Sequence, residues 1–370
     1  MDTENKTKRL LSIDALRGFD MFFIMGLAGL ITSICALFPD GDKSWLATQM
    51  THVSWDGLRH HDTIFPLFLF ITGLSFPFSY SKSVSKGMTR SQITKKAIIR
   101  GLVLFFFGLV YNGFFNLKFS SLRWMSVLGR IGLSWMIAAI LYIYCKRNTR
   151  IWICVAILIG YWLINAFLIA PDAPAGASPF SKEGNWCVWL DRMLMKGHMY
   201  NEVYEPEGII GHLTGAVTAM LGIFTGEYIR EGKASGNKKT LVMFGAAAAM
   251  LAAGLLWSLV YPINKALWSS TFVLVVGAYS LAMFAIFYWI VDVKGWKKWT
   301  PVFTVVGMNS ITIYMVQRIV DMRGINRFFF KGLSELLPKP WSAVLLSATF
   351  VLVCWLLLYF LYRKKIFLKV

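Results

Sequence analysis

The chain consists of long apolar runs separated by short polar segments. Most runs are about twenty residues long, the length at which a helix crosses the hydrocarbon core of a bilayer, whereas the strands of a membrane barrel would alternate apolar and polar residues over about ten positions. The pattern predicts an all-α polytopic membrane protein, a single bundle of about ten transmembrane helices. The expected helices cover the run that ends near residue 38 and the ranges 62–80, 97–115, 125–145, 151–170, 208–229, 241–261, 269–291, 302–320 and 341–362.

Composition agrees with this class. Hydrophobic residues make up 56% of the 370 residues and charged residues 15%, far from the averages of soluble proteins. A net charge of +19 would suggest nucleic-acid binding in a soluble protein. Here the basic residues cluster in short segments between apolar runs, so the positive-inside rule accounts for them without any nucleic acid.

The basic residues also predict the orientation. The N-terminal tail, the C-terminal tail and the alternate loops between them carry 22 Lys and Arg residues, while the other loops carry 12. Both termini are therefore expected in the cytoplasm. His52 and the polar segment 171–207 are expected on the opposite side, which is the periplasm in a Gram-negative bacterium. No linker, low-complexity tract or clear repeat divides the chain, so residues 1–370 are expected to form one domain.

The polar residues with the strongest chemical signal lie in the segment 51–73, THVSWDGLRHHDTIFPLFLFITG, at the start of an apolar helix. His52 can act as a general base because a histidine side chain titrates near neutral pH. Asp56 or Asp62 is close enough in sequence to orient its ring, and Trp55 is a natural stacking platform for a sugar. The alternative is a structural loop histidine. No CxxC or HExxH spacing occurs, so no metal is expected.

Ionisable residues inside the apolar runs are the next signal, because each is costly at the centre of a membrane helix and is usually retained for a purpose. Asp14 and Arg17 share one helical face and can pair. Arg100 begins an expected helix on the cytoplasmic side, and Arg130 lies inside another near the outer side. Together they favour a polar route through the bundle. Snorkelling at the interface and structural ion pairs are the alternatives.

Several segments resemble one known family along nearly the whole chain. The opening SIDALRGFDMFF resembles the first-helix motif of a broad set of membrane acyltransferases. The segment 51–73 resembles the part of the heparan-α-glucosaminide N-acetyltransferase family that carries its active-site histidine. Further similar segments follow in the same order: WLDRMLMKGHMYN, YEPEGIIGHL, YPINKALWSSTFVL, VDVKGW, GMNSITIYM and YRKKIFLKV. The large N-terminal luminal region of the animal enzyme is absent, as expected of a compact member in a bacterial inner (cytoplasmic) membrane.

The resemblance implies a transmembrane acetyltransferase that takes acetyl-CoA from the cytoplasm and acetylates the amine of a terminal glucosamine on the far side. The family's active-site histidine falls on His52 by its position in the motif. One departure is Ala28, which stands where the family has an active-site Asn in the first helix. The acceptor is then an amino sugar or a glycosaminoglycan-type chain, and the family suggests a homodimer.

The resemblance and the charges together predict roles for other residues. The phosphates of CoA are expected near cytoplasmic cations, with Arg17 and Arg100 the best candidates. His52, steered by Asp56 or Asp62, is expected to be the general base, and a donor such as Asn264, Lys265 or Asn309 to stabilise the oxyanion. The predicted cofactor-binding residues are Arg17, Arg100, Arg130 and Asn309. The predicted acceptor contacts are Trp55, Glu205, Glu207, Asn264 and Lys265.

Other functions and mechanisms stay open at this point. An acetyl-histidine intermediate is the alternative to direct transfer. A membrane O-acyltransferase of envelope polysaccharide would share the first-helix motif but acylate hydroxyl groups. A sugar transporter or flippase would also have buried charges and a polar path, although no inverted repeat or pair of broken helices is evident in the sequence.

Overall fold

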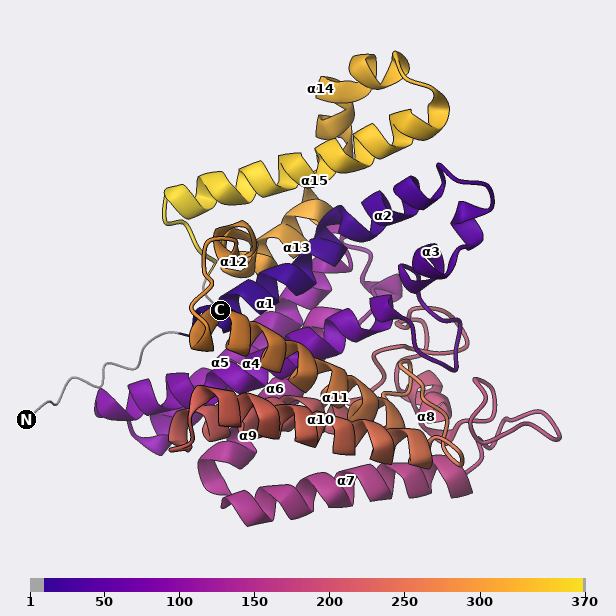
Figure 1. Cartoon of the computed structure of the whole chain (residues 1–370). Coiled ribbons are helices and arrows are strands. Elements are labelled where there is room, and N and C mark those ends of the chain that lie inside the picture. Colours follow the sequence, from indigo (N-terminus) through magenta and orange to yellow (C-terminus); the bar gives the residue numbers. More distant parts are fainter. Residues whose placement is uncertain (1–9, 369–370) are drawn as a thin grey trace, which may run out of the picture. The chain divides into compact units, whose positions relative to one another are not determined.

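The structure is a computed structural model that describes residues 10–368 (Figure 1). Within these residues every regular element is a helix, and the only extended pairings are two isolated β-bridges, Asp56 with Asn264 and Ile169 with Asn185. The all-α class expected from the sequence is therefore confirmed for the described residues.

Seven helical stretches among the described residues are long and apolar enough to cross a bilayer, which agrees with a polytopic membrane protein. They are Leu11–Cys35 (α1, Leu11–Phe22, and α2, Ala28–Cys35), α4 (His60–Ser85), α6 (Val127–Tyr144), α7 (Arg147–Phe167), α10 (Gly236–Trp257), Ser270–Val293 (α11, Ser270–Phe287, and a π-helical turn), and α15 (Lys339–Arg363). Each lies on one of the ten apolar runs read from the sequence.

The other three runs differ from these seven. Two form single helices, α5 (Arg90–Tyr111) and α9 (Gly211–Glu231), which carry more charged, glycine and threonine residues. The run 302–320 was expected to be one helix, but it divides into α12 (Thr300–Gly307) and α13 (Ser310–Ile319). The division falls in a Gly-Met-Asn-Ser sequence, where α12 ends at Gly307 and α13 begins at Ser310.

The described chain divides into two compact units. Unit 1 comprises residues 10–53, 59–64 and 283–368, and unit 2 comprises residues 54–58 and 65–282. Unit 1 thus contains α1, α2, α3 (Trp45–Gln49), the first turn of α4, and the chain from the end of α11 to α15, including α14 (Met322–Glu335). Unit 2 contains the rest of α4 and of α11 and the helices between them, including α8 (Trp186–Leu194).

Helix α1 is the centre of unit 1 and packs directly on α12. A β-carbon at Gly18 would lie 1.8 Å from the carbonyl oxygen of Phe303, so only glycine allows the two backbones to approach so closely. The π-helical turn Phe23–Leu27 interrupts the helix between α1 and α2. Gln317 of α13 donates from Nε2 to the carbonyl oxygen of Met25 in this turn (2.8 Å). The side chain thereby satisfies a backbone group in the interrupted part of the helix.

The long helices of unit 2 alternate in direction along the chain (Figure 1). Arg150 at the start of α7 bonds to Glu227 at the end of α9 (2.8 Å), and Asn112 after α5 donates to the carbonyl oxygen of Arg123 before α6 (3.0 Å). One end of the unit therefore carries the connections 86–89, 145–146 and 232–235. The other end carries 112–126, 168–210 and 258–269. At Gly222 a β-carbon would lie 2.0 Å from the carbonyl oxygen of Phe70, which makes the contact between α9 and α4 as close as that in unit 1.

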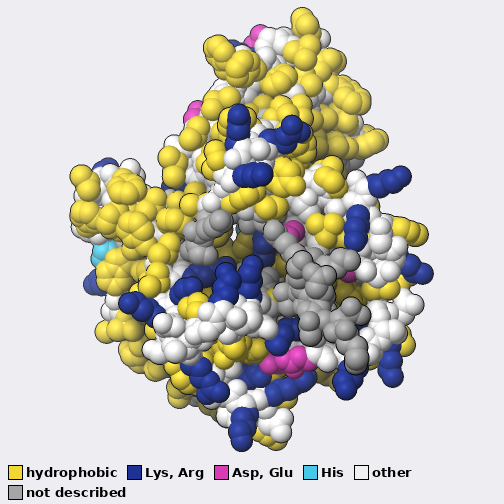
Figure 2. All heavy atoms as spheres, turned by 90° about the vertical axis from the view of Figure 1, so that its left-hand side faces the viewer, with side chains coloured by type: hydrophobic (Ala, Val, Ile, Leu, Met, Phe, Trp, Pro, Cys, Tyr) yellow, Lys and Arg dark blue, Asp and Glu magenta, His cyan; other side chains and the backbone are white. Residues whose placement is uncertain are grey.

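Figure 2 shows the face on the left-hand side of Figure 1, where Lys and Arg side chains far outnumber Asp and Glu side chains. The three short connections 86–89, 145–146 and 232–235 of unit 2 lie on this side. Basic residues thus gather at one end of unit 2, as the pattern of loop charges predicts.

Candidate active site

The candidate site in unit 1 is built around a histidine–carboxylate pair, His52 and Asp62. Nδ1 of His52 lies 2.7 Å from Oδ1 of Asp62, and the Asp62 side chain is fully buried while that of His52 is 57% exposed. Oδ2 of Asp62 accepts the backbone N–H groups of Val53 (3.3 Å) and Arg59 (3.2 Å). Both carboxylate oxygens therefore have hydrogen-bond donors, and the carboxylate is held in one orientation.

This geometry selects the chemical role of the imidazole. A carboxylate can only accept hydrogen bonds, so Nδ1 of His52 carries the proton that lies between the two residues. The basic lone pair is then on Nε2, on a ring that is more than half exposed. An imidazole whose inner nitrogen is oriented by a buried carboxylate is the arrangement that a general base or a nucleophile requires.

The loop around His52 is held by side chains of the same segment. Nη1 of Arg59 donates to Oγ1 of Thr51 (2.6 Å) and to the carbonyl oxygen of His52 (3.0 Å). Oε1 of Gln49 accepts the backbone N–H of His60 at the start of α4 (2.8 Å). These bonds join residues 49–52 to residues 59–60, so they hold the backbone that carries the imidazole of His52 in place.

The second carboxylate considered from the sequence, Asp56, belongs to unit 2 and has a different partner. Its Oδ1 accepts Nδ2 of Asn264 (3.0 Å), and the backbones of the two residues form a β-bridge. Oδ1 of the buried Asn264 accepts the N–H of Leu267 (2.9 Å). Asp56 and Asn264 thus fasten the turn at 54–58 to the connection 258–269, while the neighbouring Lys265 is half-buried.

Trp55 is part of an aromatic cluster in unit 2. Its indole N–H donates to the carbonyl oxygen of Phe180 (2.8 Å), which fixes the ring, and the ring of Tyr204 meets it edge-on with centroids 5.2 Å apart. Nζ of Lys182 lies 5.5 Å from the Trp55 ring centroid and 5.1 Å from that of Tyr204. A fixed, half-buried indole of this kind can stack on the apolar face of a sugar ring.

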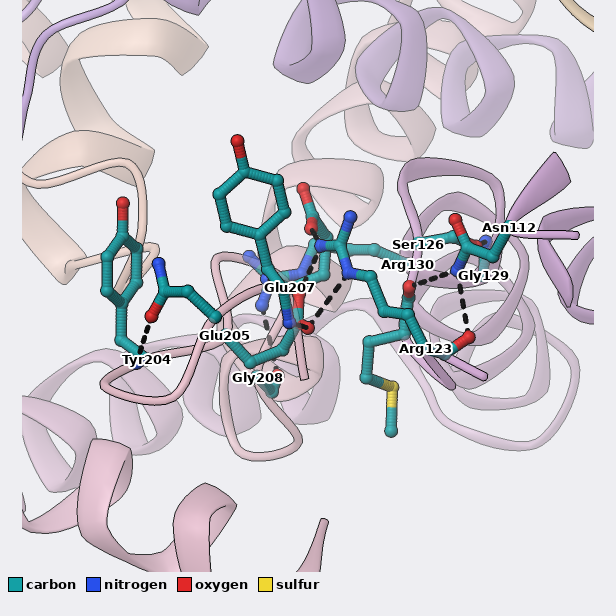
Figure 3. Close-up of polar contacts among 12 residues, drawn as sticks. Asn112, Arg123, Ser126, Gly129, Arg130, Tyr204, Glu205, Glu207 and Gly208 are labelled. Carbon is teal, nitrogen blue, oxygen red and sulfur yellow. Dashed lines mark hydrogen bonds and ion pairs between the residues drawn. The ribbon is translucent and has the colours of Figure 1, made fainter. Parts of the chain in front are cut away.

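Glu205 and Glu207 are joined by one arginine that the sequence interpretation did not include (Figure 3). The guanidinium of Arg123 binds both carboxylates, with Nε 2.9 Å from Oε2 of Glu205. Burial favours a lower pKa for Arg123, but the hydrogen bonds that it donates to Glu205 and the two negative charges outweigh burial and raise the pKa. Burial favours a higher pKa for Glu205, yet Arg123 lowers it, whereas burial dominates at Glu207 and raises its pKa.

Asp191 and Arg130 lie beside this ion pair around a small cavity. Burial raises the pKa of Asp191 to about 7, although the N–H of Ile209 (2.9 Å) and the charge of Arg130 oppose the shift. Arg130 is 1% exposed and donates from Nη2 to the carbonyl oxygen of Gly208 (3.0 Å). Its Nε and Nη1 have no hydrogen-bond partner among the described residues. The cluster fastens the connection 168–210 to α6.

The remaining residues considered for acetyl-CoA already have partners. In unit 1, Nη1 of Arg17 is 3.5 Å from Oδ1 of Asp14, and Nδ2 of Asn309 donates to the carbonyl oxygen of Ile366 (3.2 Å). In unit 2, the guanidinium of Arg100 lies over Trp135, 4.4 Å from the ring centroid. Among the described residues, no group of three or more His, Cys, Asp and Glu side chains could hold a metal ion.

Four residues of the site that contact distant parts of the chain could not be singled out from the sequence. Arg123, Asp191, Lys182 and Tyr204 gain their significance from contacts with residues far along the chain. The only available signal was their place within or beside the polar outer segments, which is shared by many residues without such contacts.

The helices and the buried polar groups define the class, a polytopic α-helical membrane protein. No family model matches the chain. It is 27% identical to the human heparan-alpha-glucosaminide N-acetyltransferase over 98% of its own length and 28% identical to the mouse protein of the same name over its full length. The chain is thus similar, along its own whole length, to proteins named heparan-alpha-glucosaminide N-acetyltransferase. The chain spans 60% and 62% of the length of these two relatives.

Proposed function

We propose that the chain is a transmembrane acetyltransferase that moves an acetyl group from acetyl-CoA to the amine of a terminal glucosamine. The single observation that carries the chemistry is the His52–Asp62 pair, a half-exposed imidazole oriented by a fully buried carboxylate. The names of the two relatives support the choice of acetyl group and amino sugar. The chain's own acceptor is then an amino sugar or a glycosaminoglycan-type chain that ends in one.

The transfer step needs one base and balances without a further reactant. The amine nitrogen attacks the thioester carbonyl of acetyl-CoA, and Nε2 of His52 takes the proton that the nitrogen loses. The carbon–sulfur bond then breaks, and the proton passes from His52 to the CoA sulfur, so the products are the amide and free CoA. Asp62 stabilises the imidazolium that exists between the two steps, because its buried carboxylate lies 2.7 Å from Nδ1.

The two ends of the protein would serve the two substrates. Acetyl-CoA is a polyanion that enters from the cytoplasm in this account, where basic side chains gather, and Arg17 and Arg100 remain the proposed contacts for its phosphates. The acceptor would reach the outer segment, with Trp55 as its stacking surface. Glu205 and Glu207 would act mainly by holding that segment in place through Arg123. Lys265, Asn264 and Asn309 remain the proposed oxyanion donors, and at present Asn264 is bonded to Asp56 and Asn309 to the carbonyl oxygen of Ile366.

The same proposal includes the arrangement in the membrane. Seven apolar helices, together with α5, α9 and the divided run of α12 and α13, give about ten spans. Both termini are then cytoplasmic, and the outer segment 171–207 faces the opposite side. We propose that the chain forms one domain, lies in a bacterial inner membrane and acts as a homodimer.

A sugar transporter is the second candidate function. Unit 1 contains a π-helical interruption between α1 and α2 and a division between α12 and α13, although the sequence showed no pair of broken helices. Interrupted helices are a recurrent feature of transporter binding sites. A membrane O-acyltransferase would use the same His52 but form an ester.

One experiment separates these functions. The purified full chain is placed in liposomes with radiolabelled acetyl-CoA on one side and glucosamine on the other, and the labelled product is treated with mild base. An amide that survives the treatment supports the proposed function. A base-labile ester would instead favour O-acylation, and movement of unmodified glucosamine across the membrane would favour transport.

A further inference from the structure

Within unit 1, helix α14 (Met322–Glu335) packs against its neighbours through one face only. Its buried residues Met322, Asn326 and Ser334 follow a spacing of four and eight and therefore lie along one side of the helix. The α14 helix packs against α15, and Nδ2 of Asn326 donates to the carbonyl oxygen of Leu346 in α15 (2.9 Å). The two helices also lie together in Figure 1. The other sides of α14 are exposed.

The exposed surface of α14 has two opposite rows. Arg323, Arg327 and Lys331 form a basic row at a spacing of four residues. Ile325, Phe329 and Leu333 form an apolar row at the same spacing, and they are 39%, 68% and 52% exposed. The two rows are offset by two residues, which is about 200° around a helix. The apolar row and the basic row therefore lie on opposite sides of α14.

This separation fits a helix that lies in the plane of a membrane surface. The apolar row can enter the boundary of the acyl chains while the basic row stays among the headgroups. Phe328, 84% exposed, extends the exposed apolar surface, and Trp341 near the start of α15 is 56% exposed, as is common for tryptophan at membrane interfaces. Because the protein belongs to the polytopic membrane class, lipid is available to this face.

We propose that α14 lies in the headgroup region of the bilayer and that its basic row binds the phosphate groups of anionic phospholipids. The guanidinium groups of Arg323 and Arg327 match phosphate oxygens in bidentate geometry. Lys331 contributes less, because its Nζ already lies 3.6 Å from Oε1 of Glu335. A second copy of the chain could cover the apolar row, but it would leave the cations without counter-charges.

Photo-crosslinking tests this interaction directly. The full-length protein is reconstituted in nanodiscs that contain photoactivatable phosphatidylglycerol or phosphatidylcholine, with the reactive group on the lipid headgroup, and the labelled peptides are identified by mass spectrometry. We expect phosphatidylglycerol to label the peptides of α14 more strongly than phosphatidylcholine. In Arg323→Gln/Arg327→Gln/Lys331→Gln this labelling should fall by about 25-fold, since Arg323 and Arg327 at an anionic surface each contribute about fivefold.

The control variant removes the same charge elsewhere in unit 1. Lys294→Gln/Lys297→Gln/Lys298→Gln should leave the labelling of α14 unchanged. If the first variant cannot be purified in folded form, the wild type decides alone: its labelling by phosphatidylglycerol must fall as salt rises, because screening weakens the contact. Equal labelling by the two lipids would overturn the proposal, as would the absence of lipid labelling together with cross-links between α14 helices of two copies.

Discussion

The pairing of His52 with Asp62 predicts that Asp62→Asn, which replaces one carboxylate oxygen by an NH₂ group, lowers kcat strongly. In the wild type, Oδ1 of Asp62 faces Nδ1 of His52, and Oδ2 accepts two backbone N–H groups, those of Val53 and Arg59. The asparagine must place its NH₂ group on one of these two sides. On the backbone side, the NH₂ would leave two N–H donors without an acceptor, at about 1–3 kcal/mol each.

On the histidine side, the NH₂ only forces His52 to change tautomer. The amide is therefore expected to keep its oxygen on Val53 and Arg59 and to donate from Nδ2 to Nδ1 of His52. The imidazole then carries its proton on Nε2 and can no longer act there as a base. We expect kcat to fall by about 10²- to 10⁴-fold, the usual contribution of a general base, while binding of acetyl-CoA stays unchanged.

The assay is a steady-state measurement of acetyl transfer by the purified full chain, with acetyl-CoA binding measured separately by calorimetry. Asp40→Asn is the matched control in the same unit, because Asp40 has a positive φ of 51° that asparagine tolerates, and its 82% exposed side chain pairs with Lys43 (3.4 Å). Asp40→Asn should keep wild-type activity. Wild-type kcat in Asp62→Asn would refute the role of the pair, and a parallel loss of acetyl-CoA binding would refute the tautomer explanation.

Three other predictions concern unit 2. Burial raises the pKa of Asp191 from 3.8 to about 7, so between these pH values the folded state holds a proton that the unfolded state releases. The free energy of unfolding should therefore fall by about 4 kcal/mol as the pH rises from 3.8 to 7, and thermal unfolding of Asp191→Asn should lack this pH dependence. Arg123→Gln leaves two buried carboxylates without their cation and should cost about 3–5 kcal/mol at pH 7. The cost should be smaller at pH 4, because burial without Arg123 raises the pKa of both carboxyl groups and favours their neutral forms; an equal loss at both pH values would contradict this. Gly222→Ala should prevent close packing of α9 on α4 and lower the melting temperature, whereas Gly245→Ala, with no atom within 4 Å of the new β-carbon, should not.

The all-α membrane class could be predicted from the sequence because the length of an apolar run is read directly from consecutive residues. Apolar runs of about twenty residues must satisfy their backbone groups as helices in a membrane, whatever their neighbours. The division between α12 and α13 was not visible in this way, because the hydropathy of the run 302–320 does not show where a helix ends within it. The amphipathic helix α14 was readable from its spacing of four, but residues 321–340 were treated as a loop.

The candidate site was predicted in part. The segment 51–73 could be chosen from its content of ionisable residues, and His52 from its chemistry and the family motif. The sequence could not decide between Asp56 and Asp62, because the turn at 54–59 sets which carboxylate meets Nδ1 of His52. The partner of Glu205 and Glu207 lies 82 and 84 residues away along the chain, in Arg123, and only the fold brings it there.

The most direct test of the account compares wild type with His52→Ala in liposomes supplied with labelled acetyl-CoA and glucosamine. We expect an acetylated amino sugar from the wild type and none above background from His52→Ala, with acetyl-CoA bound equally by both. Undiminished product from His52→Ala would contradict the assignment of the base. A wild-type protein that binds acetyl-CoA but acetylates no amino sugar would contradict the proposed acceptor.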